Sequence, residues 1–215
     1  MVQSRVVCVL AGAALSALVL GGCAGGDPGV AQTPSPSASA SAAASASPSA
    51  EPTPTPSPAS AAGPAVNIPV PEKPALADEN SVEGLEAFTE WWFELLNYAQ
   101  ATNDFEPLWA VTDKGCKTCT NFEDFVQASY SDEGWIAGGD VKVQSFDSTL
   151  EPTVDGTIDS YVSTTQAALT VYGQKGAPKE YFDAYSEPRV GLAISAHESG
   201  TWRMYDYGDI TVSND

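Results

Sequence analysis

Apolar residues recur at helical spacing over residues 81–101, and glutamates occupy the opposite side of the same turns. The apolar stripe comprises Leu85, Phe88, Trp92, Leu95, Leu96 and Ala99. The acidic side comprises Glu83, Glu86, Glu90 and Glu94. This pattern predicts a long amphipathic helix that Asn80 or Ser81 caps. Ala87, Trp91 and Tyr98 widen its apolar side, so it should pack against more than one element.

Two shorter helices are expected after the long one. Residues 105–111 have Pro107 in what would be a first turn, where proline is tolerated. Thr120 and Glu123 have the spacing of a capping box, and Phe122 and Val126 follow at helical spacing. The third helix is therefore predicted over residues 121–130.

Beyond Gly138-Gly139 the apolar period changes to two, which is typical of strands. Strands are expected over residues 141–146, 161–172 and 189–196, and a last one around Trp202 and Met204. Val190, Leu192 and Ile194 alternate and should share one face. Helices followed by antiparallel strands indicate the α+β class, with one long and two short helices packed on a sheet of about four strands.

The N-terminal segment has the zones of a signal peptide. Arg5 precedes an apolar run over residues 6–20, which is about fifteen residues long, whereas a membrane span needs about twenty. Leu20-Gly21-Gly22-Cys23 follows, and it resembles the lipobox of bacterial lipoproteins. The resemblance implies that residues 1–22 are removed and that Cys23 carries a diacylglycerol. Two acyl chains are enough for stable membrane attachment.

Residues 23–68 consist almost entirely of Ala, Ser, Pro, Thr and Gly. Such a segment buries too little apolar surface to offset the entropy of ordering, so we expect a disordered linker that reaches on the order of 100 Å. All five Trp lie after it. Residues 69–215 should therefore form the folded domain.

The chain is strongly acidic, with 28 Asp and Glu against 9 Lys and Arg. Loss of Arg5 with the signal peptide would take the formal net charge from −19 to −20. This balance excludes a nucleic-acid partner, which requires a basic surface. It also argues against a domain that lies flat on anionic lipid.

Parts of the domain resemble known families. The elements Gly84-Leu85-Glu86-Ala87-Phe88, Trp91-Trp92 and Leu96-Asn97-Tyr98-Ala99, continued by Cys116-Lys117-Thr118-Cys119, resemble a family of uncharacterised actinobacterial lipoproteins. A long aromatic helix, two shorter helices and a curved antiparallel sheet resemble the cone-shaped fold of the nuclear transport factor 2 (NTF2) and SnoaL-like superfamily. The resemblance implies a fold and a location but no activity.

Cys116 and Cys119 remain after Cys8 is removed and Cys23 is lipidated. Outside the membrane, the default state of such a pair is a disulfide. A redox pair is an alternative, since a cysteine near a helix N-terminus has a depressed thiol pKa. A zinc site would need further ligands, and His197 is the one histidine in the chain.

The cone fold often holds a pocket between its long helix and its sheet. Trp91, Trp92, Tyr98 and Trp109 are candidates to line it. Enzymes of the superfamily place a carboxylate and a tyrosine there, and candidates by residue type are Tyr98, Tyr161, Tyr205, Asp206 and Tyr207. No spacing singles out any of them, and His197 falls in a predicted turn.

We therefore expect an extracytoplasmic lipoprotein, anchored in the cell membrane, whose domain binds a ligand or partner without catalysis. The partner would be a cell-wall or extracellular protein or a small molecule. Neither a cofactor nor a metal is expected. The alternatives are a small-molecule isomerase or cyclase that uses the pocket, and thiol redox through Cys116-Cys119.

Overall fold

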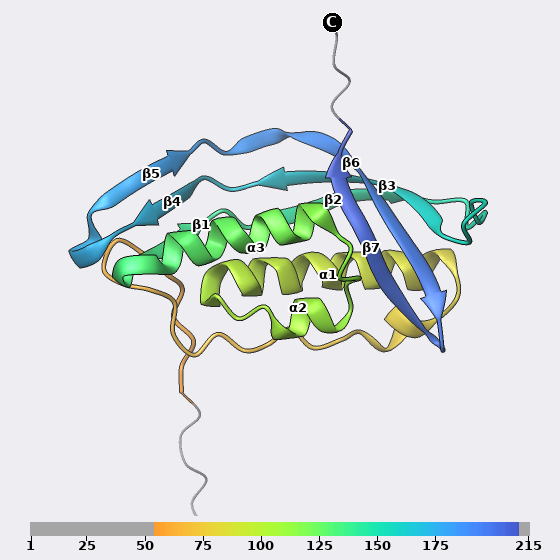
Figure 1. Ribbon diagram of the computed structural model, residues 1–215, viewed down its shortest axis with the longest axis horizontal. Helices are drawn as coiled ribbons and strands as arrows, with labels where there is room; N and C mark the ends of the chain where they lie inside the picture. Colours follow the sequence, from red (N-terminus) through yellow and green to blue (C-terminus); the bar gives the residue numbers. More distant parts are fainter. Residues whose placement is uncertain (1–53, 211–215) are drawn as a thin grey trace, which may run out of the picture. The chain divides into compact units, whose positions relative to one another are not determined.

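The computed structural model describes residues 54–210, in which three helices pack against antiparallel strands (Figure 1). The helices are α1 (Val82–Thr102), α2 (Glu106–Ala110) and α3 (Lys117–Tyr130), with short 3₁₀ turns at Ala75–Asp78, Ser131–Glu133 and Gln174–Gly176. The strands are β1 (Trp135–Gly138), β2 (Val141–Asp147), β3 (Ile158–Gln166), β4 (Leu169–Tyr172), β5 (Pro178–Phe182), β6 (Tyr185–Glu198) and β7 (Thr201–Asp209). The expected α+β class, with one long and two shorter helices, is confirmed.

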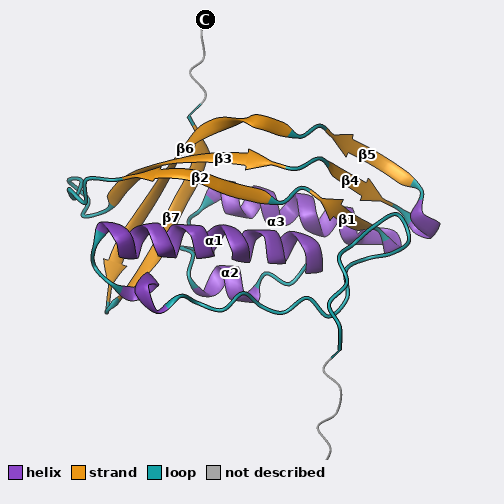
Figure 2. Ribbon diagram, turned by 180° about the vertical axis from the view of Figure 1, so that it is seen from behind, coloured by secondary structure: helices purple, strands orange, loops and turns teal. Residues whose placement is uncertain are grey.

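The strands form two antiparallel sheets rather than the single sheet of about four strands expected. One has the order β1-β4-β5 and the other the order β2-β3-β6-β7. β1 is followed by β2, β3 by β4 and β5 by β6, in each case after two residues. Each of these two-residue gaps is a break between one strand and the next. The three breaks are aligned, because the strand ends beside them pair with one another: Gly138 with Leu169, and Leu169 with Phe182. The strands arch over the helices across this line of breaks (Figures 1 and 2).

Glycines and side-chain amides make the line of breaks possible. Gly138 and Gly139 adopt φ values of 76° and 85°, the left-handed region that glycine enters without strain. The Gln100 amide, which α1 buries, donates from Nε2 to Gly138 O at 3.0 Å. The Gln166 amide donates to Gly139 O at 3.1 Å. Carbonyls that the ladders no longer use are thus satisfied by the two glutamines.

The ends of α1 are capped as its sequence suggests. The Ser81 hydroxyl accepts a hydrogen bond from Gly84 N at 2.9 Å, and Asn103 ends the helix at φ 60°. The Tyr130 hydroxyl of α3 lies 2.6 Å from Ala101 O and 3.1 Å from Gln100 O, and it donates to this last turn. Burial raises the pKa of Tyr130 to about 12, so the hydroxyl stays a donor at neutral pH.

Trp92 and Thr112 connect α1 to α2 and to the edge of the sheet. Trp92 Nε1 donates to Thr112 Oγ1 at 2.8 Å, and Thr112 Oγ1 donates to Leu108 O at 2.7 Å. Both side chains are buried. The backbone around Thr112 runs parallel to β7, with Asp113 N donating to Met204 O at 2.7 Å. This segment covers the outer edge of β7, which would otherwise present unpaired backbone groups.

Helix α3 begins at Lys117, four residues before the start that the sequence pattern predicts. The Sγ atom of Cys116 caps it by accepting from Cys119 N at 3.1 Å. Thr120 lies inside the helix, where its hydroxyl donates to Cys116 O at 3.0 Å instead of capping. The predicted capping box is therefore wrong.

The strand predictions differ from the structure in three ways. The strand expected over residues 161–172 is interrupted, because the line of breaks separates β3 from β4. The short strands β1 and β5 were not predicted. In β6 the side that faces the core is made by Gly191, Ala193 and Ser195, whereas Val190 is 45% exposed on the other side.

Residues 57–66 form a small hairpin on the domain, although composition assigns them to the linker. Ser57 and Val66 exchange backbone hydrogen bonds of 2.9 and 3.0 Å, and Ser60 and Gly63 exchange bonds of 2.9 and 3.1 Å. Trp135 Nε1 donates to Ser60 O at 2.8 Å. A flat indole suits the small residues of this segment, so contacts with the domain begin before Pro69. Within residues 54–210, no helix combines the length and apolarity that crossing a membrane requires.

Removal of two buried hydroxyls, those of Thr112 and Ser160, should have different effects on the free energy of unfolding. Thr112→Val leaves the buried Trp92 N–H without an acceptor and should lower the free energy of unfolding by about 1–3 kcal/mol. Ser160 Oγ is buried and has no hydrogen-bond partner among the described residues, so Ser160→Ala should leave that free energy unchanged or raise it. Urea denaturation of both variants is the measurement. Equal losses in the two would contradict this assignment.

Candidate functional site

A cleft of about 220 Å³ opens between the helices and the concave side of the larger sheet. Helix α1 contributes Trp92, Phe93 and Leu96, and the first turns of α3 contribute Thr118, Cys119 and Phe122. The strands contribute Val141, Thr164, Gln166, Tyr185, Tyr207 and Gly208. Five of these side chains are aromatic, which is typical of a small-molecule site.

Three aromatic rings form the inner wall of the cleft. Phe93 and Tyr207 meet edge to face, with centroids 4.9 Å apart, and Trp92 lies 5.2 Å from Phe93 and 5.9 Å from Tyr207. Edge-to-face contacts of this kind hold rings in fixed orientations. The wall therefore exists before any ligand arrives.

Gly191 of β6 makes room for the Tyr207 ring. A Cβ atom at this position would lie 2.5 Å from the Tyr207 hydroxyl oxygen and 2.7 Å from Cζ. The ring lies directly on the Gly191 backbone, and any larger residue would displace it. Close approach, rather than an unusual backbone conformation, is thus the reason for glycine here.

The polar groups of the cleft come from β3 and β6. Thr164 Oγ1 and the Tyr185 hydroxyl lie 3.4 Å apart, and the Gln166 amide is partly engaged by Gly139 O. None of the described residues that line the cleft carries a carboxylate, an imidazole, an amine or a guanidinium. The cleft can form hydrogen bonds with a ligand but lacks a carboxylate or histidine for proton transfer.

A second hollow of about 270 Å³ shares Phe122 and Gln166 with the cleft. It lies between Phe125 of α3 and Leu169 and Phe182 at the line of breaks. Phe125 and Phe182 meet edge to face there, with centroids 5.7 Å apart. Asp183 is the one carboxylate among the described residues that line this hollow.

The disulfide of Cys116 and Cys119 lies at the rim of the cleft. Their Cα atoms are 5.3 Å apart, and both side chains are buried, at 0% and 4% exposure. Asp206 Oδ1 lies 3.3 Å from Cys116 Sγ. A carboxylate at this distance would disfavour a thiolate on Cys116, and burial would restrict access to it. The pair fixes the start of α3, which supplies one wall of the cleft.

The four pocket candidates of the sequence are not brought together. Trp92 lines the cleft, but Trp91, the preceding residue of α1, points to another side of the helix and donates from Nε1 to Pro71 O at 3.1 Å. Tyr98 lines a separate groove, and its hydroxyl donates to Asp104 at 3.0 Å. Trp109 donates to Glu123 at 2.9 Å between α2 and α3. Trp91 and Trp92 point about 100° apart around α1, and Tyr98 and Trp109 have hydrogen-bond partners elsewhere, so the four rings do not share one cleft.

The residues considered as catalytic candidates by type also lie apart. Tyr161 is 51% exposed, on the outer side of β3. The Tyr205 hydroxyl donates to Glu198 at 2.5 Å, and this hydrogen bond raises the pKa of Tyr205. Tyr207 is the one member of the set that lines the cleft. Among the described residues, no group of three or more His, Cys, Asp or Glu could hold a metal ion.

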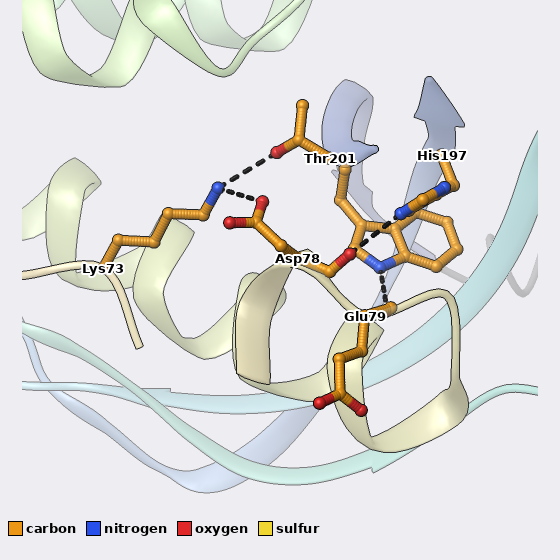
Figure 3. A network of polar contacts seen from close by, with 6 residues as sticks. Lys73, Asp78, Glu79, His197 and Thr201 are labelled. Atoms are coloured by element: carbon orange, nitrogen blue, oxygen red, sulfur yellow. Dashed lines mark hydrogen bonds and ion pairs between the residues drawn. The ribbon is translucent and has the colours of Figure 1, made fainter. Parts of the chain in front are cut away.

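His197 belongs to a polar network that holds the β6–β7 hairpin against the segment before α1 (Figure 3). Its Nε2 donates to Asp78 O at 2.9 Å, and Trp202 Nε1 donates to Glu79 O at 2.8 Å. Lys73 forms an ion pair with Asp78 and lies 3.0 Å from Thr201 Oγ1. The hydrogen bond from Lys73 lowers the pKa of Asp78. This network is remote from the residues of the cleft and has a structural role.

Phe122, Gln166 and Tyr185 are among the cleft residues that the sequence analysis did not select as site residues. They come from α3, β3 and β6, far apart in the chain, and only the packing of the helices on the sheet brings them together. Phe122 was recognised as a helical apolar position but not as a site residue. Cys23, the expected lipidation site, lies outside the described residues.

A family model described as "Family of unknown function (DUF6318)" matches residues 54–207. No curated protein matches the sequence. Among solved structures, the chain is similar to the intermembrane space region of chloroplast protein ARC6, with a TM-score of 0.41 and 10% identity over 60% of this chain and 95% of that one. It is also similar to Aln2 from a Streptomyces species, with a TM-score of 0.36 and 16% identity over 58% of this chain and 89% of that one. Scores this low do not establish a common fold.

Replacement of Gly191 should disturb the inner wall of the cleft. Gly191→Ala forces the Tyr207 ring away, which should lower the free energy of unfolding by about 1–3 kcal/mol and change the near-ultraviolet circular dichroism of Trp92. Gly208→Ala is the matched control, because the nearest atom to its Cβ is Thr118 Oγ1 at 4.0 Å. Similar spectra for wild type and Gly191→Ala would show that the ring contact is not fixed.

Proposed function

We propose that the domain binds a small ligand in the cleft without catalysis. The chain belongs to the DUF6318 family of unknown function. One observation carries the proposal: the cleft has five aromatic side chains and hydroxyls from Thr118, Thr164 and two tyrosines, and none of the described residues that line it is charged. Such a lining holds an apolar body and orients it with a few hydrogen bonds.

An isomerase or cyclase is the less favoured alternative. Proton abstraction beside a carbonyl needs a base within hydrogen-bond reach of the substrate. Asp206 is a candidate by residue type, but its Oδ1 accepts from Tyr207 N at 3.0 Å and lies against Cys116 Sγ. Its carboxylate is therefore engaged outside the cleft lining.

Thiol redox is disfavoured by the surroundings of the cysteine pair. Exchange requires an accessible sulfur and a stabilised thiolate. Cys116 is fully buried and has a carboxylate oxygen beside its sulfur. We assign the pair a structural role at the start of α3.

The domain is proposed to be an NTF2-like cone. The support is the bent arrangement of strands, the packing of α1 on their concave side and a cleft between helices and sheet. On this view the cleft corresponds to the open end of the cone.

The protein is further proposed to act outside the cell membrane as a lipoprotein of actinobacterial type. The support is the sequence Leu20-Gly21-Gly22-Cys23 after a short apolar run, followed by a segment rich in Ala, Ser and Pro. The membrane is then a partner through the lipid, and the ligand comes from the cell wall or the medium. The acidic chain would be repelled from anionic lipid headgroups.

The lipid anchor is testable by metabolic labelling in a bacterial host. Radiolabelled palmitate should appear in the wild-type chain and be absent from Cys23→Ala, and the variant should be released from the membrane fraction. Cys8→Ala is the control and should be labelled normally. Equal labelling of wild type and Cys23→Ala would exclude Cys23 as the anchor.

The cleft is testable with a variant that fills it. Gly208→Leu adds a side chain at the rim where a Cβ meets little, so the fold should be retained. The probe is the neutral compound 4-phenylbutan-1-ol, for which we expect a Kd on the order of 0.1–1 mM by nuclear magnetic resonance titration. Gly208→Leu should weaken this binding at least about tenfold.

Gly63→Leu is the matched control, because a Cβ at Gly63 meets no atom within 4 Å and the hairpin is remote from the cleft residues. It should bind the probe as wild type does. Absence of binding to wild type, or equal binding to both leucine variants, would overturn the proposed function.

A further inference from the structure

Arg189 places a positive charge beside the uncharged lining of the cleft. Arg189 and Gly191 lie two residues apart on β6 and share one face of the strand, and a register shift separates them from Tyr185. Arg189 pairs with Thr164 of β3, which lines the cleft. The guanidinium carbon lies 4.1 Å from the centroid of the Tyr185 ring, another lining residue. The cation thus lies over the ring of one lining residue and on the strand position paired with another, beside the cleft.

This guanidinium has no carboxylate partner among the side chains that the structure describes. The ion pairs there join Lys73 to Asp78 and Arg203 to Glu198. Glu187 precedes Arg189 by two residues and forms no ion pair with it. Acidic residues outnumber basic ones 28 to 9 in the chain, so an exposed arginine without such a partner is available for an external anion.

Stacking on Tyr185 leaves the hydrogen-bonding edge of the guanidinium free. A cation–π contact uses the face of the group, whereas its N–H donors point outward in a planar fork. That fork fits the two oxygens of a carboxylate. The tyrosine restricts the arginine to the rim and so reduces the entropy lost when an anion binds.

We propose that the ligand of the cleft is a small amphipathic monoanion. Its apolar body, a ring or short chain, lies against Trp92, Phe93 and Tyr207, and its carboxylate or similar end lies at Arg189. This assignment rests on the proposed function and adds the chemical class of the ligand.

Size and charge both support this class. An apolar cavity of about 150 Å³ holds benzene, so about 220 Å³ accepts a ring with a short substituent. Asp183 lies in the neighbouring hollow and would disfavour an anion there. The charge distribution therefore orients the ligand, with its anionic end at Arg189 and its apolar end toward Phe122.

Three isosteric probes test the assignment. The chain, secreted with Cys23→Ser, is titrated with 4-phenylbutyrate, 4-phenylbutan-1-ol and 4-phenylbutylamine while its amide resonances are followed. Because an exposed charge contact is weak, the carboxylate should bind about threefold more tightly than the alcohol, and the amine more weakly than either. Sodium chloride at about 0.5 M should reduce this preference by screening.

Arg189→Gln should bring the affinity for the carboxylate to that for the alcohol and leave the alcohol within about twofold of wild type. Lys175→Gln changes the net charge equally at an exposed turn outside the cleft lining and should keep the preference. Equal affinities for carboxylate and alcohol in the wild type, or a preference that survives Arg189→Gln, would overturn the inference while the proposed function stands. Failure of all three probes to bind would overturn the proposed function itself.

Discussion

The aligned breaks in three neighbouring strands are the constraint on which the site depends. Where a ladder stops, its backbone groups need new partners, and here Gln100 of α1 and Gln166 of β3 accommodate the carbonyls of Gly138 and Gly139. One of these amides comes from the long helix and the other also lines the cleft. The position of α1, the bend of the strands and the shape of the cleft are therefore determined together. A flat, continuous sheet would leave no such space beside α3.

Local signals predicted the elements better than they predicted the site. The periodicity around Leu85 and Trp92 and the cap at Ser81 are properties of neighbouring residues, and α1 follows the prediction closely. The start of α3 was misplaced because a disulfide sulfur caps it, which no residue pattern encodes. β1 and β5 were not predicted because they are short and are stabilised by pairing with β4, which the local sequence does not reveal. The cleft brings Trp92 together with residues more than twenty positions away in the chain. The sequence pattern could therefore predict only the wall that α1 forms.

The glutamates of the long helix are kept apart from the lining of the proposed site. The glutamates of α1 lie on the side of the helix that the core does not use, and Glu90 remains exposed beside Glu86 and Glu94. Partial desolvation and mutual repulsion raise the pKa of Glu90, which shows how closely these carboxylates are spaced. The cleft is instead lined with rings and hydroxyls, with Arg189 at its rim. A strongly acidic chain can thus offer a locally favourable place for an anion.

The hairpin of residues 57–66 affects how the domain responds to mechanical load. A pull from the chain ahead of residue 54 reaches the Ser57–Val66 pair first, and hairpin bonds loaded at one end open one after another. Opening them frees about ten residues, or roughly 30 Å of extended chain, before tension reaches the Trp91–Pro71 contact on α1. The hairpin would therefore act as a small extensible element that opens before such a pull reaches α1, the helix that carries Trp92 and Phe93 of the inner wall of the cleft.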